Sequence, residues 1–225
     1  MRLVYLTGID GAGKTTLAHT LVQDVQSQGV ESHYMYAQHI PFLLAPLKWL
    51  AQRSFIRSTN AKNDYAAYSV RKTEASRRYS KLSRLYAVAW LIDYFCMTYW
   101  RLLPHLFRHS WLVVDRYYFD IVTNISQTLG LSTEQAVALA QKVSKFFPTP
   151  EIILYIDLPE EVAFARKNDI AGVEYLRERR QWYRTLGKTF KFVYLNGNQS
   201  PAQVHQDALN QLEHLLPYNY GGRGE

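Results

Sequence analysis

Apolar residues along the chain are grouped in two alternating patterns. Short continuous runs rich in β-branched, aromatic and leucine side chains are typical of buried strands, and they predict strands at Leu3–Leu6, Ser32–Tyr36, Trp111–Asp115, Glu151–Ile156 and Lys191–Leu195. Between these runs, apolar residues recur at helical spacing, which predicts helices at Lys14–Ser27, Val70–Phe107 with a break inside it, Ser132–Phe146, Pro159–Lys167, Gly172–Gly187 and Pro201–Leu215. Strands that alternate with helices predict a parallel sheet covered by helices on both faces. Ligands of such sheets bind at the carboxyl ends of the strands.

The turn after the first predicted strand is rich in glycine and reads GIDGAGKTT, from Gly8 to Thr16. Its spacing matches G-x-x-x-x-G-K-[ST], in which inward-facing backbone N–H groups surround phosphate oxygens. The lysine, Lys14, would reach the β- and γ-phosphates, and the hydroxyl of Thr15 would bind Mg²⁺. The helix that Thr16 starts would direct its positive dipole end at the anion. We therefore expect the nucleotide to contact Gly8, Asp10, Gly11, Ala12, Gly13, Lys14, Thr15 and Thr16.

A second group of polar residues ends the strand at Trp111–Asp115, in the stretch WLVVDRYYFD. A carboxylate at the end of a neighbouring strand commonly faces the Mg²⁺ of a phosphate loop, so Asp115 is the second predicted metal ligand, directly or through water. Arg116 could clamp a phosphate with two parallel hydrogen bonds, and Tyr117 could pack on a sugar or base. A turn with a surface ion pair is the alternative, and the upstream loop favours the site.

The stretch LYIDLPEEVAFARK places Arg166 and Lys167 at the end of a predicted helix. Arginines of a closing lid stabilise the charge that develops during phosphoryl transfer. Arg166 is the first candidate for this role and Lys167 the second. Three further arginines fall on one face of the next predicted helix, where a solvated stripe paired with glutamates explains them equally well: Arg177, Arg180 and Arg184.

Length and cysteine content limit the organisation of the chain. Its 225 residues fit one domain, which we expect at residues 1–217, with a lid at about 166–173 and a disordered tail at 218–225. The only cysteine, Cys96, excludes an internal disulfide and fits a reducing compartment. The apolar run at the N-terminus feeds the glycine loop and does not read as a signal peptide, so we expect a cytoplasmic protein.

Two apolar segments and one basic segment need separate interpretations. Leu85–Leu103 is long enough to span a bilayer, but Asp93 at its centre favours a helix buried in a soluble core. Ile40–Ala51 is interrupted by prolines and too short to span, so packing over a pocket is favoured over contact with a membrane or partner. Gln52–Arg84 holds nine Lys or Arg against two acidic residues, which accounts for the whole net charge of +7. It is either a solvated face or a site for an anionic partner.

Taken together, the motifs resemble those of the thymidylate kinase family and, more broadly, of nucleoside monophosphate kinases. GIDGAGKTT, DRY at Asp115–Tyr117 and LYIDLPEEVAFARK at Leu154–Lys167 carry the resemblance, and VYLNGNQSPAQVHQDAL at Val193–Leu209 adds to it. The resemblance implies an α/β fold, a P-loop NTPase three-layer sandwich with a five-stranded parallel sheet. It also implies transfer of the γ-phosphate of ATP, with Mg²⁺, to a monophosphate.

The same resemblance implies roles for further residues. Asp10 would contact the acceptor sugar or the transferred group, and Asn196 would lie beside adenine. No protein nucleophile is needed, because positioning and charge neutralisation supply most of the rate. Members of the family often form dimers through their long helices, so a homodimer is an expected assembly.

The acceptor side departs from the family pattern. The family's Arg-Glu-Pro-Gly-Gly stretch is absent after the second strand, where the chain reads YMYAQHIPFLLAP. In the long helix, Asp93 of the family's acceptor-binding pattern is retained, but Tyr94 replaces its arginine. The acceptor set is therefore predicted as Asp10, Asp93, Arg116 and Tyr117.

Three functions remain open at this point. The first is a nucleoside monophosphate kinase that makes dTDP from dTMP by family default. The second is a related kinase whose acceptor is a sugar phosphate or a lipid-linked intermediate. The third is a nucleotide-dependent protein that holds nucleic acid through its basic segment. The intact Lys14, Thr15, Asp115 and Arg166 disfavour the third, and no stable nucleic-acid partner and no membrane span are expected.

Overall fold

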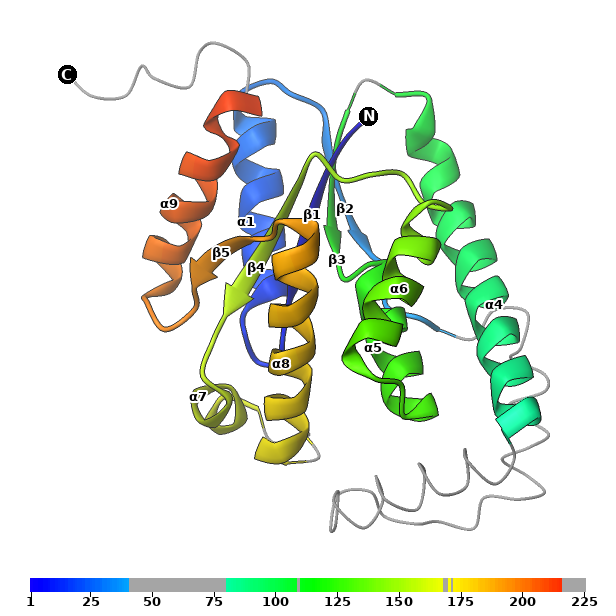
Figure 1. The fold of residues 1–225 in the computed structure, drawn as a ribbon. Helices are drawn as coiled ribbons and strands as arrows, with labels where there is room; N and C mark the ends of the chain where they lie inside the picture. Colours follow the sequence, from blue (N-terminus) through cyan, green and yellow to red (C-terminus); the bar gives the residue numbers. More distant parts are fainter. Residues whose placement is uncertain (41–79, 109, 168–169, 171, 216–225) are drawn as a thin grey trace.

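Five parallel strands form the central sheet of the computed structural model, which describes residues 1–40, 80–108, 110–167, 170 and 172–215 (Figure 1). The strands are β1 (Arg2–Gly8), β2 (Ser32–Tyr36), β3 (Trp111–Asp115), β4 (Ile152–Asp157) and β5 (Val193–Asn196). Their order in the sheet is β2-β3-β1-β4-β5, and every neighbouring pair is parallel. The predicted five-stranded parallel sheet is confirmed; the limits of β2 and β3 are as predicted, and those of the other strands differ by one or two residues.

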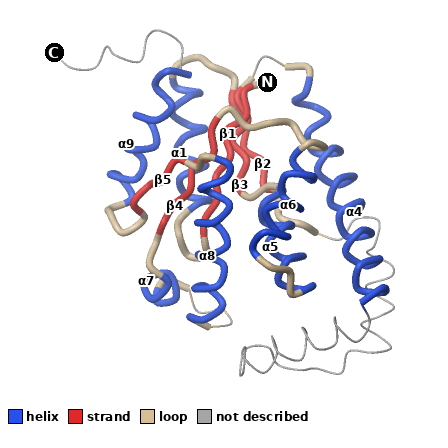
Figure 2. Tube along the Cα trace, in the orientation of Figure 1, coloured by secondary structure: helices blue, strands red, loops and turns tan. Residues whose placement is uncertain are grey.

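Helices cover both faces of this sheet (Figures 1 and 2). They are α1 (Lys14–Ser27), α4 (Ser80–Leu106), α5 (Tyr118–Leu129), α6 (Thr133–Ser144), α7 (Glu160–Ala165), α8 (Val173–Phe190) and α9 (Pro201–Leu212), followed by the short 3₁₀ helix η1 (Glu213–Leu215). α1 and α9 lie side by side on one face, and α4, α5 and α8 cover the other. This layering is the three-layer α/β arrangement that the sequence predicts.

Helix α5 is the element that the sequence pattern did not predict. Its residues are mostly aromatic and β-branched, which are moderate helix formers, although Tyr118, Ile121, Val122, Ile125 and Leu129 recur at helical spacing. The helix is buried between α4, α6 and α8, and its polar residues Asp120, Thr123 and Ser126 are buried with it. Its first turn is closed by Asp120, whose carboxylate accepts from the Tyr117 backbone N–H at 3.3 Å, and Gly130 ends it in the left-handed region at φ 60°.

Helix α4 is buried on one side only. Tyr94, Met97 and Leu102 face the core, whereas Leu85 is 66% exposed and Trp100 is 70% exposed. The prediction of a helix buried in the core was therefore wrong for half of its surface. Residues 70–79 of the predicted helix lie outside the described residues. A search of the described residues found no helix long and apolar enough to cross a membrane.

Several predicted features fall outside what the structure describes. These are most of the apolar segment Ile40–Ala51, most of the basic segment Gln52–Arg84, the centre of the lid at about 166–173 and the tail 218–225. Their roles stay predictions, as does the division into one domain with a terminal tail.

Candidate functional site

The glycine loop between β1 and α1 adopts a conformation that only glycine tolerates at two positions. Gly11 has φ 87°, and a Cβ there would lie 2.6 Å from the Ala163 carbonyl oxygen of α7. Gly13 has φ 88° at the start of α1, and its carbonyl accepts from the Leu17 N–H at 3.0 Å. The loop therefore turns its backbone tightly in front of the first turn of α1, where free N–H groups favour an anion.

Lys14 is folded back onto this loop. Its ammonium donates to the Ile9 carbonyl oxygen at 2.7 Å, and the side chain is buried. Burial, with help from the nearby Arg116 guanidinium, lowers the pKa of Lys14 to about 8, although Asp10 and Asp115 oppose the shift. A phosphate in the loop would restore a counter-charge to the ammonium.

The lowered pKa of Lys14 predicts a loss of ATP capture in mild alkali. The ammonium is present below about pH 8 and is lost as the pH rises through that value, because the folded protein disfavours the charged form. We expect kcat/KM for ATP, which reports groups of the free enzyme, to fall up to about tenfold per pH unit above this pKa. A pH profile of kcat/KM checks it, and a profile that stays flat well above pH 8 would refute the assignment.

Thr15 and Asp115 meet as a metal site requires. The Thr15 hydroxyl donates to Asp115 Oδ2 at 2.5 Å, so the lone pairs of its oxygen stay available to a cation. Asp115 is 0% exposed, and its Oδ1 is a buried oxygen with no hydrogen-bond partner among the described residues. A hydroxyl and a carboxylate oxygen without a hydrogen-bond partner are the hard ligands that Mg²⁺ prefers, so the two residues fit this ion, and their role as its ligands stays a prediction.

Arg116 directly follows β3 in the left-handed region, at φ 65°. Its backbone N–H donates to the Leu6 carbonyl oxygen at 3.1 Å, and its guanidinium pairs with Asp10 and, at 3.0 Å, with Asp120. Although burial opposes it, Arg116 and Lys14 hold the pKa of Asp10 well below its usual range. The left-handed backbone conformation of Arg116 persists only when surrounding contacts fix it. Here the two carboxylates and the backbone hydrogen bond to Leu6 do so.

A buried polar network behind Arg116 was missed by the sequence predictions. Asp120 on α5 accepts from Tyr5 at 3.0 Å and from Tyr183 at 2.6 Å, and it lies 3.6 Å from the Arg179 guanidinium. Arg179 is 3% exposed and donates to Asn124 at 2.7 Å and to Tyr183 at 2.9 Å. Two signals were available: a lone aspartate inside the apolar run YYFDIV, and the spacing of four residues that joins Tyr175, Arg179 and Tyr183.

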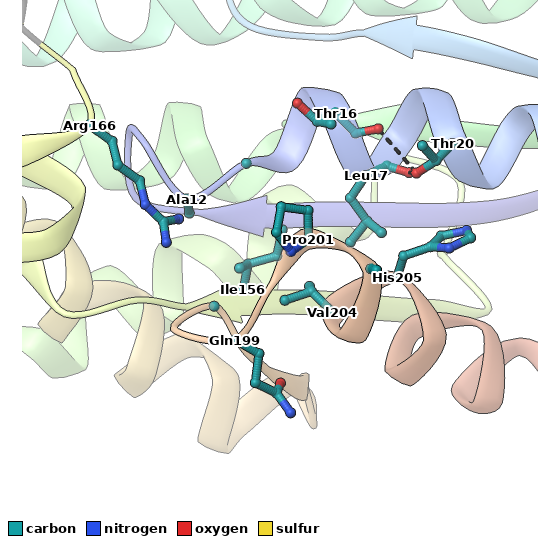
Figure 3. Close-up of a pocket in the computed structure, with 13 residues that line it drawn as sticks. Ala12, Thr16, Leu17, Thr20, Ile156, Arg166, Gln199, Pro201, Val204 and His205 are labelled. Carbon is teal, nitrogen blue, oxygen red and sulfur yellow. Dashed lines mark hydrogen bonds between the residues drawn. The ribbon is translucent and has the colours of Figure 1, made fainter.

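Two adjoining cavities are lined by most of the residues predicted to bind the donor nucleotide. One of about 380 Å³ is lined by Asp10, Lys14, Thr15, Tyr36, Arg116 and Arg166. The other, of about 240 Å³, lies between α1 and the start of α9, where Leu17 points toward Pro201 and Val204 (Figure 3). Gly13, Thr16 and Arg166 line both cavities. Gly197 and Gln199 line the second cavity, whereas the Asn196 side chain accepts from the Asn198 N–H at 3.1 Å.

A third, smaller cavity of about 60 Å³ lies beside two of the predicted acceptor residues. Asp10, Arg116, His39, Tyr94, Asn124 and Arg179 are among its lining residues. Asp93 contributes indirectly: it is 2.8 Å from His39 Nε2, and Trp90 donates to His39 Nδ1 at 2.7 Å. Tyr117 is not among the residues that line these three cavities; it packs in the core on Phe147, and its hydroxyl donates to the Pro148 carbonyl oxygen at 3.4 Å.

The three arginines of the α8 face hold this helix to the end of β4 and to α7. Arg180 pairs with Asp157 and Glu160, both at 2.8 Å, and Arg184 pairs with Asp157 at 2.7 Å. Arg177 lies 3.0 Å from Glu160 and 3.6 Å from Glu174. These ion pairs favour the structural alternative over direct contact with a ligand.

Comparison with known proteins finds relatives of nearly the same length. The chain is 25% identical over 224 residues to a protein named probable thymidylate kinase 1 from Saccharolobus solfataricus, covering 96% of this chain and 98% of the relative. It is 26% identical over 221 residues to a probable thymidylate kinase of Pyrococcus abyssi, covering 95% and 96%. It is 27% identical over 198 residues to a thymidylate kinase of Blochmanniella floridana, covering 82% of each. No family model matches the chain.

Proposed function

The chain belongs to the thymidylate kinase family as a divergent member, and on this premise we propose that it transfers the γ-phosphate of ATP to a nucleoside monophosphate, with dTMP as the family's default acceptor. The observation that carries the proposal is the single cavity in which Lys14, Thr15, Arg116 and Arg166 converge. Asp115 is connected to this cavity by the hydrogen bond that it accepts from Thr15.

The donor nucleotide is proposed to lie along the two adjoining cavities. Its base would occupy the cavity beside Pro201 and His205. Its phosphates would lie in the cavity of the glycine loop, and Arg166, which lines both cavities, would contact them. Thr15 and Asp115 would hold Mg²⁺, which neutralises phosphate charge when it is bound. The Lys14 ammonium, released from the Ile9 carbonyl, would bind the β- and γ-phosphates.

The chain's residues act on the reaction by position and charge. The acceptor phosphate oxygen attacks the γ-phosphorus while the bond to the β,γ-bridging oxygen breaks, so ADP leaves with that electron pair. Lys14 and Arg166 would stabilise the charge spread over the transferred group, and Arg116 would hold the acceptor phosphate opposite it. Asp10 orients Arg116 in turn, because the two side chains are paired.

The second candidate, an anionic acceptor other than a nucleotide, rests on the small acceptor cavity. Arg116 and Arg179 both pair with Asp120 beside this cavity, whose volume is about 60 Å³. Tyr94 lines it where the family resemblance calls for arginine. The region that would hold the acceptor therefore differs from the family pattern, and an acceptor other than a nucleotide would account for the difference.

A phosphotransfer assay with ATP and Mg²⁺ separates these candidates. The acceptors are dTMP, dUMP, UMP, CMP, AMP, GMP and several sugar phosphates, and the Lys14→Ala protein is the blank. Turnover of dTMP above the other acceptors supports the leading proposal, and turnover of a sugar phosphate alone supports the second. Absence of transfer to every acceptor, in a protein that still binds ATP, would contradict both.

A homodimer is proposed through the exposed face of α4. Leu85, Val88, Ile92 and Phe95 recur at spacings of three and four residues and are all exposed, as in the seam of paired helices. Soluble monomers seldom expose so continuous an apolar stripe. The other exposed apolar residues of this surface are Tyr86, Trp100, Leu103 and Phe107.

A charge placed in this seam is expected to separate the subunits. Ile92→Glu would bury a carboxylate without a partner at a helix pair, so we expect the mass in solution to fall to that of one chain. Light scattering coupled to size-exclusion chromatography measures it. Tyr194→Glu, at an equally accessible site on β5, is the control and should leave the mass unchanged; a wild-type protein that is already monomeric at high concentration would contradict the proposal.

A further inference from the structure

Tyr34, in the middle of β2, reaches the carboxylate that serves the proposed metal site. Its hydroxyl donates to Asp115 Oδ2 at 3.3 Å. The same oxygen accepts from Thr15 at 2.5 Å. One oxygen of Asp115 is therefore held by two protein hydroxyls, and the other, Oδ1, is buried with no hydrogen-bond partner among the described residues.

The sheet and α1 together fix the position of this phenol. β2 pairs with β3 so that Tyr34 lies opposite Val113 and Tyr36 opposite Asp115, which brings the long Tyr34 side chain level with the strand end. His19, one helical turn after Thr15 on α1, packs against the Tyr34 ring with centroids 4.1 Å apart. The ring is thus confined between a helix and the carboxylate.

The contact restricts the orientation of the carboxylate. A hydroxyl that donates to one carboxylate oxygen limits the rotation of the group about its Cβ–Cγ bond. With Oδ2 bound by Tyr34 and Thr15, Oδ1 is the atom left to coordinate a cation or to accept a hydrogen bond from a water that the cation holds.

We propose that Tyr34 is a positioning residue of the metal site, which fixes the orientation of Asp115 so that Oδ1 serves Mg²⁺. The inference rests on the proposed ATP- and Mg²⁺-dependent function and adds a residue that no sequence motif marked. Residues that orient a metal ligand typically change metal affinity 10- to 100-fold when they are replaced. Because the Tyr34 bond is long, we expect the lower end of this range.

The test is Tyr34→Phe, which removes the hydroxyl and keeps the ring that packs on His19. We expect the Mg²⁺ concentration for half-maximal activity to rise about tenfold, while kcat at saturating Mg²⁺ stays within about twofold of wild type. Independently of activity, the affinity for a fluorescent ATP analogue is measured in EDTA and with Mg²⁺. The variant should match wild type in EDTA and lose most of the gain that Mg²⁺ gives.

Tyr194→Phe is the matched control, because its hydroxyl also makes one bond of 3.3 Å, to the Arg184 carbonyl oxygen, and lies on β5 away from the cavity. It should leave both titrations unchanged. A Tyr34→Phe protein with wild-type Mg²⁺ dependence would overturn the inference and leave the proposed function intact. Equal loss of ATP affinity with and without Mg²⁺ would also overturn it, since that indicates only packing. A wild-type protein whose ATP binding ignores Mg²⁺ would overturn the proposed metal site itself.

Discussion

Lys14→Met is expected to lower kcat for phosphotransfer by about 10³-fold, the effect of losing one preorganised charge at the transferring group. The buried ammonium lies on the loop at 2.7 Å from the Ile9 carbonyl oxygen, ready to exchange this partner for phosphate. Methionine keeps the length of the side chain and its apolar contacts. The measurement is single-turnover transfer with saturating ATP and the acceptor that the assay above identifies.

The control for this loss is Lys142→Met, which removes an exposed lysine from α6. It should retain wild-type turnover. Lys14→Arg separates charge from shape, because the planar guanidinium is larger and cannot act as a compact point charge; we expect it to recover only a small part of the rate. If Lys14→Met kept turnover within tenfold of wild type, the loop would not be the donor site.

The donor half of the site could be predicted from sequence because its chemistry is local. The glycine loop is one continuous stretch whose spacing states the geometry, and positive φ at Gly11 and Gly13 follows from residue type. Asp115 required only one further step, because parallel strands that neighbour each other end at the same edge of the sheet. β1 and β3 are such neighbours.

The buried network could not be predicted in the same way. Asp120, Arg179 and Tyr183 come from α5 and α8, and they meet only because these helices pack against each other on one face of the sheet. α5 itself was not predicted, although its apolar residues recur at helical spacing. The exposed apolar stripe of α4 could not be predicted for a different reason. The spacing of its apolar residues predicts an apolar face, but it does not tell whether that face is buried within the chain or exposed.

Tyr117 shows why a motif does not place every residue in it. Asp115 ends β3 and faces Thr15, and Arg116 turns sharply at φ 65° to reach Asp10. This turn directs the next side chain into the core, where Tyr117 packs on Tyr5 and Phe147. Three consecutive residues therefore point in three directions, which residue type alone does not determine.

Asp120→Asn is expected to lower the free energy of unfolding by about 3–5 kcal/mol, the usual result of removing one partner of a buried ion pair. Asp120 is 4% exposed and lies between two guanidinium groups, 3.0 Å from Arg116 and 3.6 Å from Arg179. Asparagine preserves the shape and one acceptor oxygen, but it leaves two buried cations with only Asp10 to balance them. Urea denaturation followed by tryptophan fluorescence measures the change.

Two further variants identify the charge, rather than the hydrogen bonds, as the cause. Glu161→Gln removes a carboxylate that is 64% exposed and 3.4 Å from Arg177, and it should cost less than about 1 kcal/mol. Arg179→Met, added to Asp120→Asn, removes one of the two uncompensated cations and should recover most of the stability, because an apolar group of similar length can replace a buried charge at little cost. If the double variant were no more stable than Asp120→Asn, loss of the bonds from Tyr5 and Tyr183 would explain the destabilisation instead, and Arg116 would not depend on a balanced network for its position.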